Sequence, residues 1–162
     1  MSTEILQADY GLPAHADAVA FLLDDYARDP MGGGEPLTDA VKATLVSELH
    51  KRPFALSILA FVDGEPAGLI NAFEGFSTFK AKPLLNLHDI TVRKAFRGRG
   101  LAQAMMRKAE DIAKARGCCK LTLEVLSGNE VALKAYERFG FAAYQLDPEA
   151  GSAHFLEKKL SG

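Results

Sequence analysis

The stretch that most constrains this chain runs from residue 87 to residue 101, where a strand passes through a glycine-rich turn into a helix. Ile90, Thr91 and Val92 are consecutive β-branched residues, which favour a strand. Apolar residues then recur at helical spacing: Leu101, Ala102, Met105, Ala109, Ile112 and Ala113. The sequence therefore predicts a strand, a tight turn and a helix in direct succession.

The turn between strand and helix has the composition of a phosphate-binding loop. Gly98 and Gly100 let the backbone present N–H groups at close range, and a helix N-terminus carries about half a positive charge. Four cations lie in or beside the turn: Arg93, Lys94, Arg97 and Arg99. Together these features predict a phosphate cradle. A plain connection with a solvated basic face explains the same residues, so this stretch alone leaves both interpretations open.

Two common phosphate-binding motifs do not fit the turn. It lacks the P-loop pattern Gly-x-x-x-x-Gly-Lys-Ser/Thr. The dinucleotide pattern Gly-x-Gly-x-x-Gly fails because Gln103 stands where the third glycine is required. The residues present are Arg97-Gly98-Arg99-Gly100-Leu101-Ala102.

Composition limits the class of protein. A chain of 162 residues with 48% hydrophobic and 25% charged residues suits a single globular domain, residues 1–162. A net charge of −2 argues against general nucleic-acid binding. We find neither a signal-peptide pattern nor the run of about 18 apolar residues that a membrane span requires. The adjacent Cys118 and Cys119 fit neither a metal site nor an ordinary disulfide, so we expect a reduced, cytoplasmic protein.

Hydrophobic periodicity and turn residues give an order of elements. We expect strands at 3–8, 54–62, 66–76, 87–92, 120–125, 141–146 and 153–160, and helices at 14–28, 39–49, 101–116 and 130–139. A polar loop is expected at 77–83, and the last two strands are expected to form a closing hairpin. This order predicts an α/β fold with a mixed, mostly antiparallel sheet and helices on both faces.

Two motifs and this order of elements resemble the GNAT superfamily of N-acetyltransferases over nearly the whole chain. The string from Arg97 to Ala102 is similar to the family's Gln/Arg-x-x-Gly-x-Gly/Ala signature, which binds the pyrophosphate of acetyl-CoA. A second segment resembles the family's "LxV…N…A…LYe…GF" pattern through Leu123-Glu124-Val125, Asn129, Ala132, Tyr136 and Gly140-Phe141. Ala135 stands where that pattern usually has Leu.

The resemblance implies acetyl-CoA as cosubstrate. The residues expected to bind it are Ile90, Val92, Arg97, Gly98, Arg99, Gly100, Leu101, Ala102 and Asn129. Backbone groups of Ile90 and Val92 would pair with the pantetheine arm as an added strand does, and an N–H near Val92 would stabilise the oxyanion. Asn129 also suits a turn or a helix N-cap, and the sequence favours neither role.

The resemblance also implies candidates for proton transfer. Tyr136 is the expected acid for the departing thiolate, with packing between helix and sheet as the alternative. Two carboxylates compete as base: Glu124, because a charge is out of place in an apolar strand, and Asp89, on the opposite face of its strand from Ile90 and Val92. His88, or a water relay with no dedicated base, remains a third choice.

We therefore expect direct transfer of an acetyl group to a primary amine, without a covalent enzyme intermediate. The alternative is a non-catalytic acyl-CoA-binding sensor or regulatory module, or an interaction domain that uses the fold as a scaffold. The acceptor is a small molecule or a peptide, and the segments 32–34 and 74–82 are expected to border its site. A homodimer is possible, no membrane or nucleic-acid partner is expected, and the histidines show no metal-ligand spacing.

Overall fold

A computed structural model describes residues 1–143 and 148–160 of the chain. Its strands are β1 (Thr3–Gln7), β2 (Ala55–Val62), β3 (Glu65–Ser77), β4 (Lys82–Val92) and β5 (Leu121–Leu123). Its α-helices are α1 (Pro13–Arg28), α2 (Asp39–His50), α3 (Leu101–Ala115) and α4 (Glu130–Phe139). Short 3₁₀ helices are η1 (Pro30–Gly32), η2 (Lys94–Phe96) and η3 (Pro148–Ala150).

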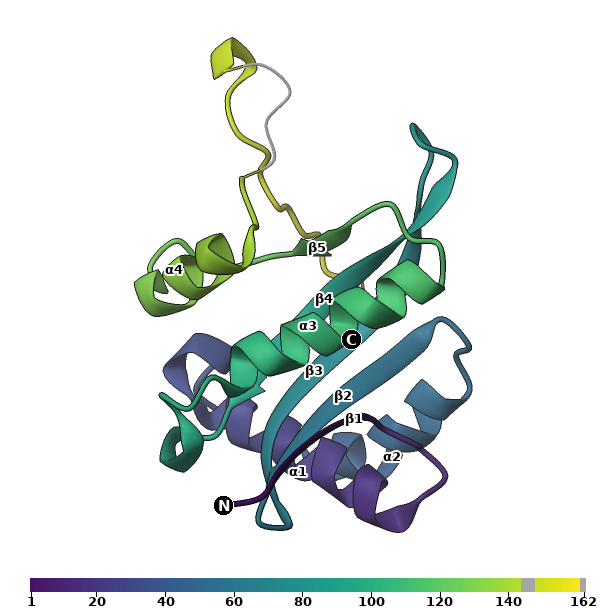
Figure 1. Cartoon of the computed structure of the whole chain (residues 1–162), viewed down its shortest axis with the longest axis vertical. Helices are drawn as coiled ribbons and strands as arrows, with labels where there is room; N and C mark the ends of the chain where they lie inside the picture. Colours follow the sequence, from purple (N-terminus) through teal and green to yellow (C-terminus); the bar gives the residue numbers. More distant parts are fainter. Residues whose placement is uncertain (144–147, 161–162) are drawn as a thin grey trace.

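The strands form one sheet in the order β1-β2-β3-β4-β5. Its neighbours are antiparallel except β4 and β5, which are parallel. Helix α3 covers one face, and α1 and α2 cover the other (Figure 1). The predicted mixed sheet with helices on both faces is therefore confirmed.

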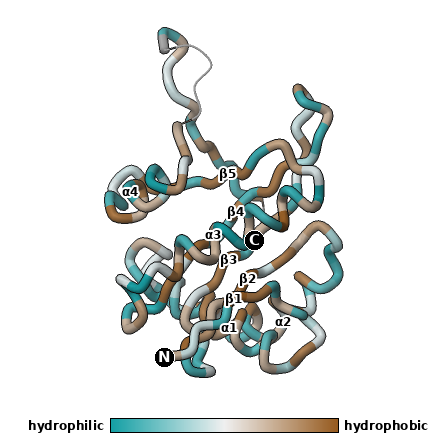
Figure 2. Tube along the Cα trace, viewed as in Figure 1, coloured by the Kyte–Doolittle hydropathy of each residue, from teal (hydrophilic) through white to brown (hydrophobic). Residues whose placement is uncertain are grey.

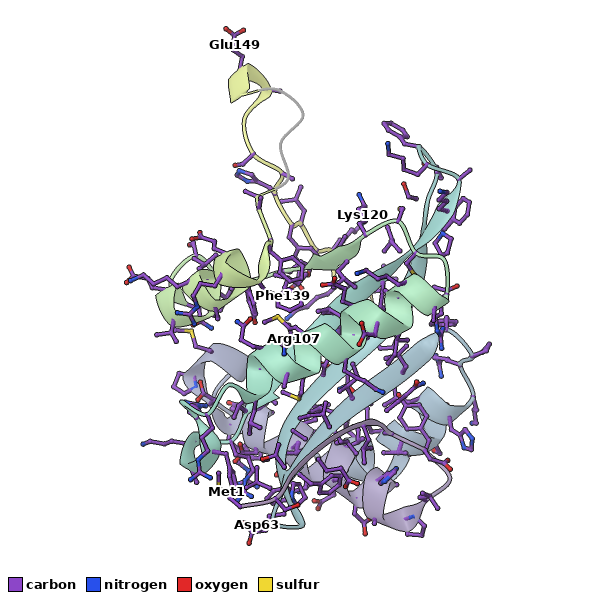
Figure 3. All side chains as sticks on the ribbon, in the orientation of Figure 1. Met1, Asp63, Arg107, Lys120, Phe139 and Glu149 are labelled. Atoms are coloured by element: carbon purple, nitrogen blue, oxygen red, sulfur yellow. The ribbon has the colours of Figure 1, made fainter. Side chains whose placement is uncertain are left out.

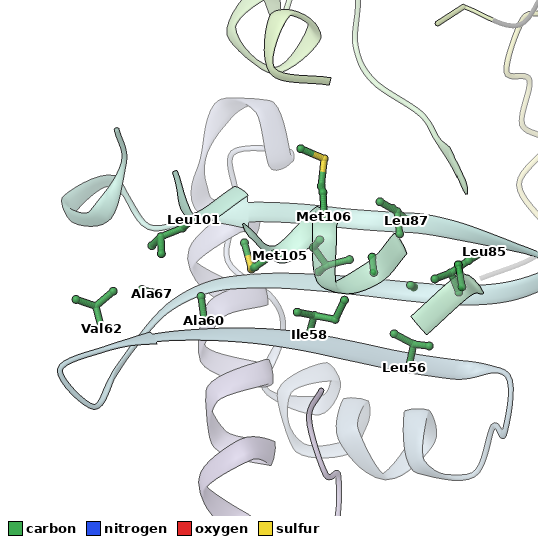
Figure 4. Packing of buried hydrophobic residues seen from close by; sticks show 14 residues of the cluster. Leu56, Ile58, Ala60, Val62, Ala67, Leu85, Leu87, Leu101, Met105 and Met106 are labelled. Carbon is green, nitrogen blue, oxygen red and sulfur yellow. The ribbon is translucent and has the colours of Figure 1, made fainter. Parts of the chain in front are cut away.

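Successive side chains of the central strands point to opposite faces of the sheet, so the core has two layers. Figure 2 shows hydrophobic residues gathered along these strands. In β2, Leu56 and Ile58 pack toward α3 beside Met105 and Met106 (Figure 4), whereas Leu59 packs toward α1. Both faces of this strand are thus buried, which explains its nearly continuous apolar sequence.

Strand β4 contains a β-bulge at His88. Leu87 pairs with Ala72 of β3 and Asp89 pairs with the adjacent Asn71, so β4 has one residue more than β3 at this point. The extra residue reverses the alternation: Leu87 lies on the α3 face, and so does Ile90, three positions later. Asp89 consequently points to the α1 face, opposite Ile90, as the sequence predicted.

The expected closing hairpin is wrong for the residues that the structure describes. Residues 141–143 and 148–160 contain no strand, and the rest of the first expected strand, 144–146, lies outside the described residues. The part of the chain around Glu149 projects from the body of the molecule (Figures 1 and 3). Phe155 and Leu156 are both exposed, at 72% and 84%, because adjacent apolar residues followed by three charged ones give no alternating face to bury.

Several strand limits also differ from expectation. β4 begins at Lys82 and β3 extends to Ser77, so the two strands occupy both ends of the expected loop at 77–83. β5 ends at Leu123 rather than at Val125. Each limit depends on pairing with a neighbouring strand, which the local sequence pattern does not contain.

Candidate functional site

The site begins where β4 and β5 separate. Their parallel pairing covers only Leu85 to Leu87 and stops at the His88 bulge. Among the strands described, none pairs with this edge of β4 beyond Leu87. The C-terminal end of β4 therefore has a free backbone edge. An extended ligand can pair with such an edge as an added strand does.

The backbone N–H and C=O groups of Ile90 and Val92 point to this free edge of β4. The N–H of Arg93 donates to the carbonyl of Ala67 on β3 at 2.8 Å. Because polar groups of successive residues in an antiparallel strand point to alternate sides, those of Val92 and Ile90 point away from β3. The carbonyl of Val92 indeed accepts a 2.9 Å hydrogen bond from Nε of Arg97, which lies outside the sheet.

The glycine turn connects this edge to the N-terminus of α3. Gly98 and Gly100 have φ values of 78° and 76°, in the left-handed region that favours glycine. Gly100 is the N-cap of α3, so no side chain caps the helix, and its first turn holds no acidic residue. A Cβ at either glycine would meet no atom within 4 Å. The turn therefore presents an open, uncapped, positively polarised helix end, which suits a phosphate group.

The four cations of the turn have different environments. Arg93 is held by the carbonyl of Pro66 at 2.9 Å and by the ring of Phe21, 5.0 Å from its guanidinium carbon. Arg99 lies over the ring of Phe96 and donates to the sulfur of Met1. Arg97 lines the cavity described next. Arg97 is therefore the cation of the turn that lines the cavity.

A cavity of about 510 Å³ lies between the free edge of β4, the turn, α4 and the end of α1. This volume is in the usual range for a small-molecule site. Nine of the residues predicted from the sequence line it: Ile90, Val92, Arg97, Gly98, Gly100, Leu101, Ala102, Asn129 and Tyr136. The strand, turn and helix of residues 87–101 and the second motif therefore meet at one site.

Tyr136 projects from α4 into the cavity. Burial, followed by the nearby Tyr26, raises the pKa of the Tyr136 phenol to about 12. Its ring packs edge-on against Phe141, with 6.1 Å between the ring centres. At neutral pH the hydroxyl is protonated, so it can donate a proton or a hydrogen bond into the cavity.

Asn129 has the helix-capping role, one of the two that the sequence left open. Its Oδ1 caps α4 by accepting from the N–H of Ala132 at 3.3 Å, and the residue also lines the cavity. Gln103 of α3 donates to the carbonyl of Ala135 at 3.0 Å, which fixes α4 against the helix that carries the cradle.

Three predicted residues do not line the cavity. Arg99 is occupied by Phe96 and Met1. Glu124 follows the end of β5 and is exposed, so the argument that its charge is buried in an apolar strand was wrong. Asp89 is partly buried behind the edge of β4, where Nδ2 of Asn71 donates to its Oδ2 at 3.1 Å. His88, on the bulge, is exposed.

The end of α1 contributes residues that the sequence analysis did not assign to the site: Tyr26, Asp29 and Met31. Burial raises the pKa of Tyr26, and the charges of Asp89 and Asp29 raise it further. The carboxylates of Asp89 and Asp29 thus act electrostatically on Tyr26, a residue of the cavity wall. Tyr26 belongs to the apolar stripe of its helix, a pattern equally typical of core packing, and Arg138 of α4 is a further lining residue without a sequence signal.

Within residues 1–143 and 148–160, no group of three or more His, Cys, Asp or Glu side chains could hold a metal ion. No helix in the same residues is long and apolar enough to cross a membrane. The chemistry of the site therefore has to be derived from the side chains and backbone groups of the cavity.

The Acetyltransferase (GNAT) family matches this chain over residues 19–141, which include every residue that lines the cavity. The chain belongs to this family. The GNAT resemblance drawn from the two sequence motifs is confirmed.

Characterised relatives of this GNAT chain are acetyltransferases. Streptothricin acetyltransferase of Streptomyces lavendulae is 34% identical over 136 residues, which cover 84% of this chain and 63% of that protein. Thialysine N-epsilon-acetyltransferase of Caenorhabditis elegans is 32% identical over 79 residues, 49% of each chain. The chain thus spans less than two thirds of the length of both relatives.

The same fold occurs in solved structures. An aminoglycoside N-acetyltransferase in complex with CoA matches this GNAT chain with a TM-score of 0.76 at 20% identity, over 98% of this chain and 96% of the other. At this identity the likeness concerns the fold alone.

Proposed function

We propose that this protein transfers the acetyl group of acetyl-CoA to a primary amine of a small acceptor. The observation that carries the proposal is the cavity at which the free edge of β4, the uncapped N-terminus of α3 and the hydroxyl of Tyr136 meet. GNAT membership supports an acyl-CoA donor, and the name of the thialysine N-epsilon-acetyltransferase supports an amine acceptor.

Residues of the chain are suited to each need of the donor. The N–H groups at the start of α3, together with Arg97, suit the diphosphate. The outward backbone groups of Ile90 and Val92 suit the amides of the pantetheine arm, since they offer the pairing that an additional strand would use. The N–H of Val92 also suits the oxyanion that forms at the thioester carbonyl.

The reaction balances with one acid and one base. The amine nitrogen forms a bond to the acetyl carbon, the carbon–sulfur bond breaks, and its electron pair goes to sulfur. Tyr136 donates its proton to that sulfur, and a base takes the proton that the amine loses. A thiol and an acetylated amine leave, and the tyrosine regains its proton from solvent.

Asp89 supports an acceptor that carries positive charge, because its carboxylate acts on Tyr26 at the cavity wall. The free thiols of Cys118 and Cys119 support a reducing compartment, and we propose a cytoplasmic location.

The test is thiol release from acetyl-CoA in the presence of an amine panel that includes streptothricin, thialysine, an aminoglycoside and an amino acid without a side-chain amine. We expect release that depends on a cationic amine and yields the acetylated product by mass spectrometry. Tight binding of acetyl-CoA with no turnover for any amine would favour the acyl-CoA-sensing alternative.

A further inference from the structure

A chain of hydrogen bonds crosses three strands behind the cavity. The hydroxyl of Tyr10 lies 2.7 Å from Oγ of Ser57, Ser57 donates to Oδ1 of Asn71 at 2.6 Å, and Asn71 donates to Asp89 at 3.1 Å. Ser57 and Asn71 are almost completely buried, at 0% and 2% exposure. Burying a polar side chain lowers stability unless its hydrogen bonds are satisfied. The hydrogen bonds of Ser57 and Asn71 satisfy this need inside the core formed by β2, β3 and β4.

The direction of every hydrogen bond in this chain follows from donor counting. Ser57 has one hydroxyl proton, which it gives to Asn71, so Tyr10 must donate to Ser57. Burial raises the pKa of Tyr10, which keeps that donor protonated. Asn71 accepts through its oxygen and therefore turns its NH₂ group to Asp89. All three bonds are donated toward Asp89.

This polarity suits an ionised carboxylate. The reversed chain would turn the carbonyl oxygen of Asn71 toward Asp89, and two acceptors would then face each other unless Asp89 carried a proton. The buried chain thus fixes one oxygen of Asp89 by a hydrogen bond and leaves the other oxygen for a different partner.

Asp89 does not line the cavity itself, but it adjoins the edge of β4 that does. It directly precedes Ile90, whose backbone points to the free edge of β4, and its charge acts on Tyr26, which lines the cavity. Tyr26 in turn acts on the pKa of Tyr136, the proposed acid. Tyr26 thus interacts electrostatically with both the Asp89 carboxylate and the Tyr136 phenol.

We propose that Asp89 is the base of the reaction and that Asn71, Ser57 and Tyr10 are positioning residues that orient its carboxylate from behind the sheet. The proposal rests on the proposed function. In the step, one N–H bond of the acceptor ammonium breaks, the proton passes to the outer oxygen of Asp89, and the nitrogen keeps the electron pair that attacks the thioester carbon. The second proton, which the nitrogen loses as the amide forms, goes to solvent, and Asp89 later releases its proton there too. Glu124 and His88 are exposed, and within residues 1–143 and 148–160 neither side chain has a hydrogen bond to a buried group.

The test is a series of variants assayed for kcat, for KM of acetyl-CoA and for thermal stability. We expect Asp89→Asn and Asn71→Leu each to lower kcat by about tenfold or more, while KM for acetyl-CoA stays unchanged. Ser57→Ala and Tyr10→Phe should give progressively smaller losses, because each lies further from the carboxylate. Asn86→Leu is the matched control: it removes a 3.0 Å hydrogen bond to Thr122 from the same strand without contacting Asp89.

A double-mutant cycle separates positioning from packing. If Asn71 acts through Asp89, Asn71→Leu lowers kcat no further in the Asp89→Asn background. Multiplicative losses, or a kcat unchanged by Asp89→Asn, would overturn the inference. If Asn71→Leu fails to fold, the same cycle with Tyr10→Phe gives the same decision, since the ring is retained. A wild-type protein that releases no thiol with any amine overturns the proposed function and this inference together, whereas an active Asp89→Asn variant overturns only the inference.

Discussion

Arg97 and Asp29, which both line the cavity, form an ion pair with 3.6 Å between Nη2 and Oδ2. The side chains are 52% and 32% exposed, so the pair stabilises the fold by no more than about 1 kcal/mol. The cation proposed to bind the diphosphate is therefore weakly held by a carboxylate from the end of α1, and a bound anion would compete with that carboxylate.

Replacing Asp29 by Asn should strengthen binding of CoA by up to about fivefold, the equivalent of about 1 kcal/mol. Asn retains the acceptor that caps η1 through the N–H of Met31, so the local fold is expected to persist. Calorimetric titration measures the change, with Asp25→Asn as a control for lost charge on the same helix. Weaker binding of CoA by Asp29→Asn would contradict the competition.

Replacing Arg97 by Ala should weaken binding of acetyl-CoA by about tenfold or more, because hydrogen bonds to charged groups are each worth about 1.5–3 kcal/mol. Lys94→Ala removes an equal charge from an exposed position that does not line the cavity, and should change affinity much less. Titrations at two salt concentrations check both variants. Equal losses would mean that general basic charge, not the position of Arg97, attracts the ligand.

Gly98→Ala and Gly100→Ala should each lower the free energy of unfolding by about 1–2 kcal/mol and weaken acetyl-CoA binding, because both positions need left-handed backbone. Gly128→Ala is the matched control, since a Cβ there also meets nothing within 4 Å but the backbone is outside that region. Thermal unfolding with and without acetyl-CoA measures both effects. An effect of Gly128→Ala as large as the others would refute the conformational argument.

Tyr136→Phe should lower kcat by about 10²-fold or more and leave acetyl-CoA affinity nearly unchanged, because the phenyl ring keeps its packing against Phe141. Steady-state thiol release and calorimetry separate the two quantities. A kcat close to wild type would show that the leaving thiolate takes its proton from elsewhere.

Tyr136 should also affect stability at high pH. Its pKa is about 12 in the folded protein, above the value of about 10 expected in the unfolded chain. Between these values the folded state binds more protons, so the free energy of unfolding falls as pH rises from about 10 to 12. Denaturant titrations across this range should show a shallower fall for Tyr136→Phe. An identical fall would mean that other groups, including Tyr10 and Tyr26, account for it.

The parts of the fold and site that local chemistry determines could be predicted from the sequence. Gly98, Gly100 and the helix that follows them form a cradle because backbone freedom and helix polarity are properties of adjacent residues. The alternating and helical patterns likewise identified α1, α3 and α4 and the two-sided sheet, because periodicity reports which face is buried.

The remaining features depend on residues far apart in the chain. The His88 bulge is defined by pairing with β3, and the short β5 by pairing with β4. Tyr26 and Asp29 reach the cavity through the packing of α1. The series of hydrogen bonds that ends at Asp89 joins residues from three strands and a loop. Glu124 illustrates the converse: its apolar neighbours suggested burial, but β5 ends one residue earlier.

The most direct test of the central claim is thermal unfolding of the wild-type protein during titration with acetyl-CoA, beside Arg97→Ala. A ligand that binds only the folded state at a hundredfold excess over Kd raises the free energy of unfolding by about 2.7 kcal/mol. We expect that increase for the wild type, and much less for Arg97→Ala at the same concentration. No stabilisation of the wild type by acetyl-CoA, CoA or a longer acyl-CoA would contradict the assignment of this cavity to an acyl-CoA donor.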